Sequence, residues 1–273
     1  MSTISTSDFT AADGAAWPTL SNGASWVFAT EGNAFVVAPT RTVLSNQGKT
    51  IATPNGTSGN RSWERAQAGT NTATDPLISV VVAQNMALSS GLGNAANSAG
   101  IFLRKLATNQ YYYVYCWALA DKAGVQYGLA IAKESPVGTL TVLKTYTFVA
   151  ASWLSGTNGS GGFVLQAKVV PSGTGVFISA RAWLGTDPTT PLVKWTNEGS
   201  YAADDGTGNG ISIGVYDATP IAGNLNGLFT ARAGGGGSST VLYDQFAYYN
   251  QAPLVIERYA SIDSAELVAG TKI

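Results

Sequence analysis

A row of aromatic residues is the main candidate for binding chemistry in this sequence. Tyr111, Tyr113, Tyr115 and Trp117 occupy alternate positions, and alternate positions of a β-strand share one face. Tyr and Trp rings stack on sugar rings while amide and carboxylate groups fix the hydroxyls, so the row predicts a glycan-binding face. Large side chains also fill the gap between two packed sheets, and core packing is the commoner use of such a row. Both interpretations stay open from the sequence.

Two further tryptophans lie in a different context. Trp63 and Trp153 are flanked by polar, Gly-rich sequence that is typical of loops. An exposed aromatic side chain in such a place marks a contact site, so both are predicted to take part in glycan binding. They would otherwise serve as plugs at the ends of the fold.

One segment could hold a metal ion. Asp204, Asp205 and Asn209 lie in the run Asp-Asp-Gly-Thr-Gly-Asn, and Ca²⁺ prefers several oxygen ligands on a bent loop. Turns use the same residue types for their backbone conformations. Calcium is therefore the one cofactor that the sequence leaves open, and no other cofactor is expected.

The acidic residues argue against glycan hydrolysis. Glycosidases use two carboxylates that face one cleft, and same-face positions along a strand are two or four residues apart. None of the 16 acidic residues has a partner at either spacing. Carboxylates from different strands could still converge, so hydrolysis remains an alternative.

Other common forms of catalysis also lack their residues. The chain contains no histidine, which removes Ser–His–Asp and Cys–His systems. The single cysteine, Cys116, lies in an apolar run without a neighbouring cation and is expected to be buried and inert. The chain is predicted not to be an enzyme.

Composition restricts the partners. Charged residues make up 11% of the chain and the net charge is −1, so there is no basic stripe for nucleic acid. No apolar stretch reaches the length of a membrane span. Residues 1–6 lack the basic and apolar regions of a signal peptide. A surface-like composition without an export signal predicts a virion surface protein of a phage; an extracellular module is the alternative.

The elements that must position these residues are β-strands. Segments of alternating apolar and β-branched residues recur at intervals of roughly ten residues, and turn residues separate them, which is the pattern of a sandwich or barrel. No window has a helical period. The predicted strands are 25–30, 34–38, 41–46, 77–85, 100–106, 110–119, 125–133, 139–148, 162–170, 176–184, 191–196, 211–216 and 240–249.

Three segments between and after these strands have their own predictions. Residues 31–33 are expected to join the first two strands as a hairpin, and residues 47–76, rich in Gly, Asn and Thr, to form a long loop. Four glycines, 234–237, are expected to form a hairpin loop. Residues 1–250 are predicted to be one domain. Residues 251–273 are predicted to be either a C-terminal arm that docks on another copy of the chain or on the particle, or an extra edge strand packed on its own domain.

Several segments, taken in order, resemble the concanavalin A-like, laminin G-like jelly-roll superfamily. The segments 8–14 with Trp26 and 31–33 look like its first hairpin, 99–104 and 109–114 like its central meander, 163–170 and 178–183 like later paired strands, and 211–216 and 243–246 like the closing strands. The resemblance implies an all-β fold of two packed antiparallel sheets, often with a glycan-binding face and sometimes a calcium ion.

Fold alone does not determine function in this superfamily. The resemblance and composition together predict a non-enzymatic phage structural protein, either a capsid decoration or a tail-associated protein, with weak glycan binding. Its expected partners are copies of itself, other virion proteins and cell-surface glycans. A secreted carbohydrate-binding module or adhesin is the second interpretation, and a glycoside hydrolase the third.

Overall fold

The computed structural model describes residues 2–32, 35–54, 61–85, 96–107, 110–121, 124–134, 140–148, 162–196, 202–204, 207–233 and 239–251. Every regular element within these ranges is a β-strand. The same ranges contain no helix that is long and apolar enough to cross a membrane.

The strands are named in chain order. They are β1 (Ser2–Ser7), β2 (Val27–Gly32), β3 (Phe35–Leu44), β4 (Gln47–Pro54), β5 (Arg61–Thr72), β6 (Pro76–Asn85), β7 (Ala96–Ala107), β8 (Gln110–Asp121), β9 (Gly124–Glu134), β10 (Leu140–Phe148), β11 (Phe163–Ser172), β12 (Gly175–Leu184), β13 (Ala202–Asp204), β14 (Gly210–Asp217), β15 (Leu225–Ala233) and β16 (Ser239–Asn250).

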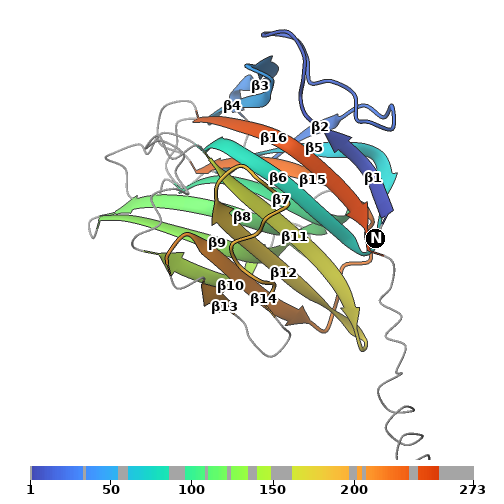
Figure 1. Ribbon diagram of the computed structural model, residues 1–273, viewed down its shortest axis with the longest axis vertical. Helices are drawn as coiled ribbons and strands as arrows, with labels where there is room; N and C mark the ends of the chain where they lie inside the picture. Colours follow the sequence, from blue (N-terminus) through green and yellow to red (C-terminus); the bar gives the residue numbers. More distant parts are fainter. Residues whose placement is uncertain are drawn as a thin grey trace, which may run out of the picture.

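These strands form two antiparallel sheets that pack face to face (Figure 1). The nine-stranded sheet has the order β13-β14-β12-β11-β6-β16-β4-β3, and β1 pairs with β16 beside this path. The seven-stranded sheet has the order β10-β9-β8-β7-β15-β5-β2. The chain is therefore an all-β, two-sheet antiparallel sandwich of the jelly-roll class, as the sequence predicted.

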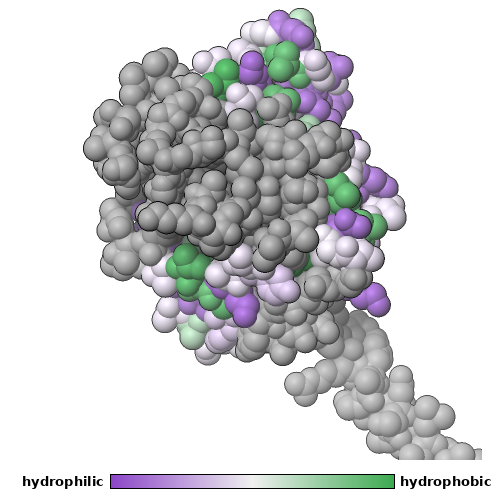
Figure 2. All heavy atoms as spheres, turned by 90° about the vertical axis from the view of Figure 1, so that its left-hand side faces the viewer, coloured by the Kyte–Doolittle hydropathy of each residue, from purple (hydrophilic) through white to green (hydrophobic). Residues whose placement is uncertain are grey.

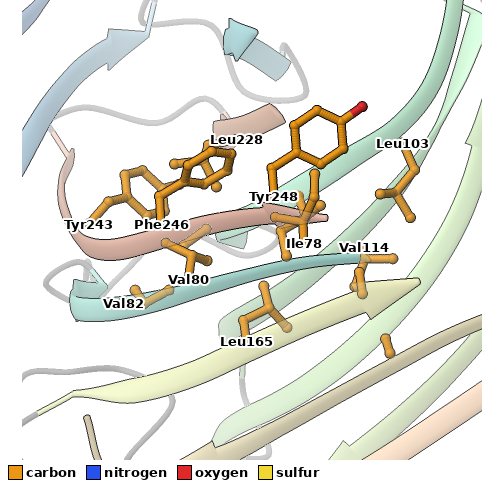
Figure 3. Close-up of a cluster of buried hydrophobic side chains, with 14 of the residues drawn as sticks. Ile78, Val80, Val82, Leu103, Val114, Leu165, Leu228, Tyr243, Phe246 and Tyr248 are labelled. Atoms are coloured by element: carbon orange, nitrogen blue, oxygen red, sulfur yellow. The ribbon is translucent and has the colours of Figure 1, made fainter. Parts of the chain in front are cut away.

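The main core lies between the two sheets. Strand β6 contributes Ile78, Val80 and Val82, which meet Leu103 and Val114 of the seven-stranded sheet (Figure 3). On the opposite face of β6, Val81 packs with Val164 and Trp183 in a separate buried cluster. Both faces of β6 are thus covered, which explains why its sequence is apolar almost throughout.

Aromatic residues near the N-terminus close one part of the sandwich. Phe9, Trp17 and Trp26 pack against one another, with ring centroids 5.0, 5.3 and 5.9 Å apart. The Trp17 indole donates hydrogen bonds to the carbonyls of Thr42 and Lys49, 3.1 and 3.2 Å away. These three rings belong to the same buried cluster as the core between the sheets.

A buried ion pair joins the two sheets. Lys133 of β9 lies 2.7 Å from Asp217 of β14, and the hydroxyl of Tyr112 in β8 donates to the same carboxylate at 2.5 Å. Although burial opposes it, hydrogen bonds from Lys133 and Tyr112 lower the pKa of Asp217. The amide of Ile221 donates in turn to the Tyr112 hydroxyl, so the polar groups of this network satisfy one another.

The expected hairpin around residues 31–33 is wrong. Strand β2 pairs with β5 in the seven-stranded sheet, whereas β3 pairs with β4 in the nine-stranded sheet. The real hairpin joins β3 to β4 through Ser45 and Asn46, whose φ angles are 51° and 60°. Two successive left-handed residues form the tight turn that matches strand twist.

Three other expectations are corrected. Most of the region 47–76, expected to be a loop, forms strands β4 and β5, because each is hydrogen-bonded to strands on both sides, which overrides weak propensity. Residues 191–196, expected to be a strand, are irregular. The glycines 234–237 lie outside the described residues, but the strands before and after them belong to different sheets, so the connection is not a hairpin. The other predicted strands are present, and β1, β13 and β15 were missed.

Candidate functional site

The predicted tyrosine row lies on the outer face of the seven-stranded sheet. Tyr112, Val114 and Cys116 of β8 face the core between the sheets. Tyr111 and Tyr113, at the alternate positions, belong instead to a separate buried cluster. Tyr111 and Tyr113 are thus buried, as the core-packing interpretation predicted, but they do not fill the gap between the two sheets. The burial of Cys116 is also confirmed.

This outer aromatic cluster consists of packed rings. Tyr111 and Tyr113 have centroids 4.3 Å apart, and Tyr113 meets Phe229 of β15 edge-on at 5.1 Å. Phe102 of β7 packs on Tyr111 at 5.9 Å. Tyr111 and Tyr113 are buried, while Tyr115 is only partly buried and packs against the cluster. Tyr111 and Tyr113 thus form a rigid base, and Tyr115 is the member that a ligand could reach.

Two charged residues contact this base. The guanidinium carbon of Arg65, in β5, lies 4.9 Å from the centre of the Tyr111 ring, which is a cation–π distance. The Tyr113 hydroxyl donates to the Glu134 carboxylate at 2.5 Å. Burial raises the pKa of Tyr113 far above its ordinary value, and nearby Tyr111 and Glu134 add to the shift. Tyr113 therefore stays protonated and keeps its donor role.

Strand register brings two predicted tryptophan positions into one row. Trp117 of β8 pairs with Ser98 of β7, Ser98 pairs with Ala231 of β15, and Ala231 pairs with Trp63 of β5. Both tryptophans lie two residues along their strands from members of the face just described, namely Tyr115 and Arg65. Trp63 is therefore in a strand rather than in the loop that its sequence context suggested.

Of the remaining predicted site residues, two lie outside the described residues and two lie next to gaps in them or at a strand end. Trp153 and Asp205 are outside the described residues, and Asp204 ends strand β13. Asn209 precedes β14, and its carbonyl accepts a hydrogen bond from Leu184. Within the described ranges, no group of three or more acidic, His or Cys side chains is placed to hold a metal ion. Calcium binding at this segment stays a prediction.

An open groove beside β1 and β16, in the nine-stranded sheet, was not predicted. Its volume is about 400 Å³, and its lining includes Thr6, Asp8, Pro188 and Gln245. Gln245 has a φ of 47° at a break in the register of β16. Burial raises the pKa of the adjacent Asp244, and Asp8 adds to the shift. A β-bulge in a central strand has no distinctive residue pattern, so it could not be predicted from the sequence.

The described surface is of mixed polarity. On the face shown in Figure 2, the residues that the structure describes form small hydrophobic groups between hydrophilic ones. Among described residues, the exposed large hydrophobic side chains come from separate elements, as with Val142 of β10 and Leu192. Single exposed apolar residues of this kind are ordinary and do not mark a site.

Comparison with known proteins gives similarity of fold. No family model matches the chain, and no curated protein matches it. A legume lectin-like domain from Entamoeba histolytica has a TM-score of 0.44 and 12% identity over 82% of this chain and 90% of its own. A protein from Mycobacterium abscessus named as a beta-glucanase has a TM-score of 0.47 and 10% identity over 90% of this chain and 100% of its own.

Proposed function

We propose that the chain is a non-catalytic module that binds glycans on the outer face of its seven-stranded sheet. One observation carries the proposal. The strand register places Trp63, Tyr115 and Trp117, three of the aromatic positions predicted for sugar stacking, in adjacent rows of one sheet face. These positions come from two strands that lie about 50 residues apart in the sequence.

The buried rings beside these positions, on the same sheet face, support a binding role. Tyr111, Tyr113, Phe102 and Phe229 are almost inaccessible to solvent, so they form a base that loses little freedom when a ligand binds. Preorganisation of this kind lowers the entropic cost of association. Each aromatic contact contributes on the order of 0.5–1.5 kcal/mol, so one face is expected to bind a sugar weakly. Several copies on one particle would raise the avidity.

The proposed absence of catalysis follows from the carboxylates. Among the described residues, the Glu134 carboxylate contacts the tyrosine base, and its Oε2 accepts a hydrogen bond from the Tyr113 hydroxyl. A glycosidase would need a second carboxylate across the scissile bond. The names of the two similar structures, a lectin-like domain and a beta-glucanase, define binding and hydrolysis as the two activities to separate.

We further propose a phage particle as the setting, with the extracellular module as the alternative. The low content of charged residues supports this setting, and weak binding at one site suits a protein displayed in many copies. Mass spectrometry of purified particles tests it directly. Absence of the chain from particles that carry its neighbouring gene products would contradict the proposal.

Screening of the pure protein on a glycan array, followed by calorimetry on the best ligand, tests the binding activity. Trp63→Ala and Trp117→Ala are each expected to weaken binding at least fivefold without changing the far-ultraviolet circular dichroism. Tyr216→Ala is the matched control, because Tyr216 is an exposed aromatic residue of the nine-stranded sheet.

Two results would contradict the proposal. One is a control variant that loses as much affinity as the tryptophan variants. The other is release of reducing ends from the bound glycan that disappears in Glu134→Gln, which would make the chain a hydrolase.

A further inference from the structure

Two cations share one tryptophan on the outer face of the nine-stranded sheet. Trp195 belongs to the irregular segment 185–196, which lies over strands β11 and β12. The Lys168 ammonium of β11 lies 4.4 Å from the Trp195 ring centre, and the Arg181 guanidinium of β12 lies 4.3 Å from it. Arg181 also lies 5.3 Å from the Trp183 ring.

The fold fixes Arg181 in this position. Its Nε donates to Gln166, which is directly opposite on β11, at 2.8 Å, and its Nη1 donates to the Val193 carbonyl at 3.0 Å. The Gln166 amide donates in turn to the Pro188 carbonyl. These bonds leave Nη2 of Arg181 for another acceptor, because a guanidinium carries five N–H groups.

The cation pair carries uncompensated charge. Among the described residues, the ion pairs are Arg104–Asp75 and Lys133–Asp217, and no carboxylate forms an ion pair with Lys168 or Arg181. Burial lowers the pKa of Arg181 to about 10. Burial, followed by the nearby guanidinium, lowers the pKa of Lys168. Two like charges that are partly removed from water are costly unless an anion joins them.

A buried hydroxyl lies next to this pair in the register. Ser179 is directly opposite Lys168 and two residues from Arg181, on the same sheet face. It is fully buried, and its Oγ has no hydrogen-bond partner. Buried hydroxyls in folded proteins are usually hydrogen-bonded. We therefore expect the Ser179 hydroxyl to bind a group that is not part of this chain.

We propose that Lys168, Arg181 and Ser179 form a site for an oxyanion, specifically the sulfate or carboxylate group of an acidic polysaccharide. Oxyanions accept the short, charge-assisted hydrogen bonds that these donors supply. The site lies on the sheet opposite to the aromatic face and does not depend on the glycan-binding activity proposed above.

A matched pair of polymers tests the site, because dextran sulfate and dextran share one backbone and differ in charge. Dextran sulfate is expected to bind the intact chain, and dextran is not expected to bind at this site. The net charge of −1 gives the chain no general attraction for polyanions. Lys168→Gln is expected to lower the affinity at least tenfold. Lys49→Gln removes the same charge from β4 of the same sheet and should change it less than twofold.

Two further measurements complete the test. One asks whether the site binds the free oxyanion or needs the polymer, and the other uses a second variant in case Lys168→Gln does not fold. Inorganic sulfate at millimolar concentration should compete with dextran sulfate, because the site is proposed to bind the oxyanion group and not the sugar backbone. Ser179→Ala keeps both charges and should weaken binding about threefold even if Lys168→Gln proves unstable. Equal loss in Lys168→Gln and Lys49→Gln, unchanged affinity in Ser179→Ala, or no binding by the intact chain would each overturn the proposal.

Discussion

The Asp217 carboxylate connects the two sheets. It accepts hydrogen bonds from Lys133 and Tyr112, which both belong to the opposite sheet. Removal of one partner from a buried ion pair leaves the other charge without compensation. Asp217→Asn is therefore expected to lower the free energy of unfolding by about 3 kcal/mol, measured by urea denaturation. Asp187→Asn changes an exposed carboxylate and should leave the urea midpoint unchanged. A double variant, Asp217→Asn with Lys133→Met, should regain part of the loss; a further loss would contradict the charge argument.

The same carboxylate should make the free energy of unfolding depend on pH in the acidic range. The pKa of Asp217 is lowered in the folded chain, whereas an unfolded Asp titrates near pH 3.9. Its contribution is therefore present above about pH 4 and is lost as the pH falls through the lower, folded pKa. Unfolding measured between pH 7 and pH 2 should show a smaller acid loss in Asp217→Asn than in the parent. Parallel curves for the two proteins would rule out this role.

The sequence identified the tyrosine row of β8 but not the face it occupies. Alternation shows that Tyr111 and Tyr113 share one face, yet it does not say which face meets the other sheet. That depends on strands far away, such as β6, whose Ile78 and Val80 pack against the opposite side of β8. The cation pair of Lys168 and Arg181 was missed because Trp195 reaches it from an irregular segment.

At the scale of elements, strand existence was easier to predict than strand pairing. The meander from β7 to β10 and the hairpin of β11 and β12 pair as their short connections suggest. The chain crosses between sheets elsewhere, as between β2 and β3, and a local pattern cannot distinguish a crossing from a hairpin. Strand β5 was taken for a loop because its buried positions are filled by Ala66 and Ala68, which pack as core residues without looking like a strand.

The β3–β4 turn provides a prediction at this scale. Ser45 and Asn46 both have left-handed φ angles, and the preferred residues for such a turn are Asn followed by Gly. Ser45→Asn combined with Asn46→Gly should raise the free energy of unfolding by about 0.5–1 kcal/mol, because a left-handed L-residue costs energy that Gly avoids. Thr72→Gly is the control, since glycine at this exposed strand position should destabilise the chain. The stability of the turn variant and of Thr72→Gly is measured by thermal unfolding. A turn variant that is less stable than the parent chain would contradict the expectation.

For the whole molecule, the last described residue marks where a truncation should start. The Gln251 amide donates to the carbonyls of Pro76 and Val169, and its backbone N–H donates to Asp75. Deletion of residues 252–273 keeps these bonds and should leave the melting temperature within about 2 °C, because the sandwich core is untouched. If the predicted arm docks on another copy, the same deletion should abolish oligomers in analytical ultracentrifugation. Unchanged assembly, or an unfolded product, would contradict the arm prediction.

The position of β16 has a consequence for synthesis in the cell. This strand lies between β6 and β4 and also pairs with β1, so the final described strand holds the nine-stranded sheet together. A ribosome that adds 5–20 residues per second needs about 12–50 s to deliver it after β1 has emerged. Until then β1 has no partner, and the sheet exists only as separate pieces with open edges. Nascent chains stalled before residue 239 should therefore be cleaved rapidly by protease, whereas released chains resist it. The nine-stranded sheet is thus completed only after β16 has left the ribosome, and any chaperone that binds the nascent chain would have to protect β1 until then.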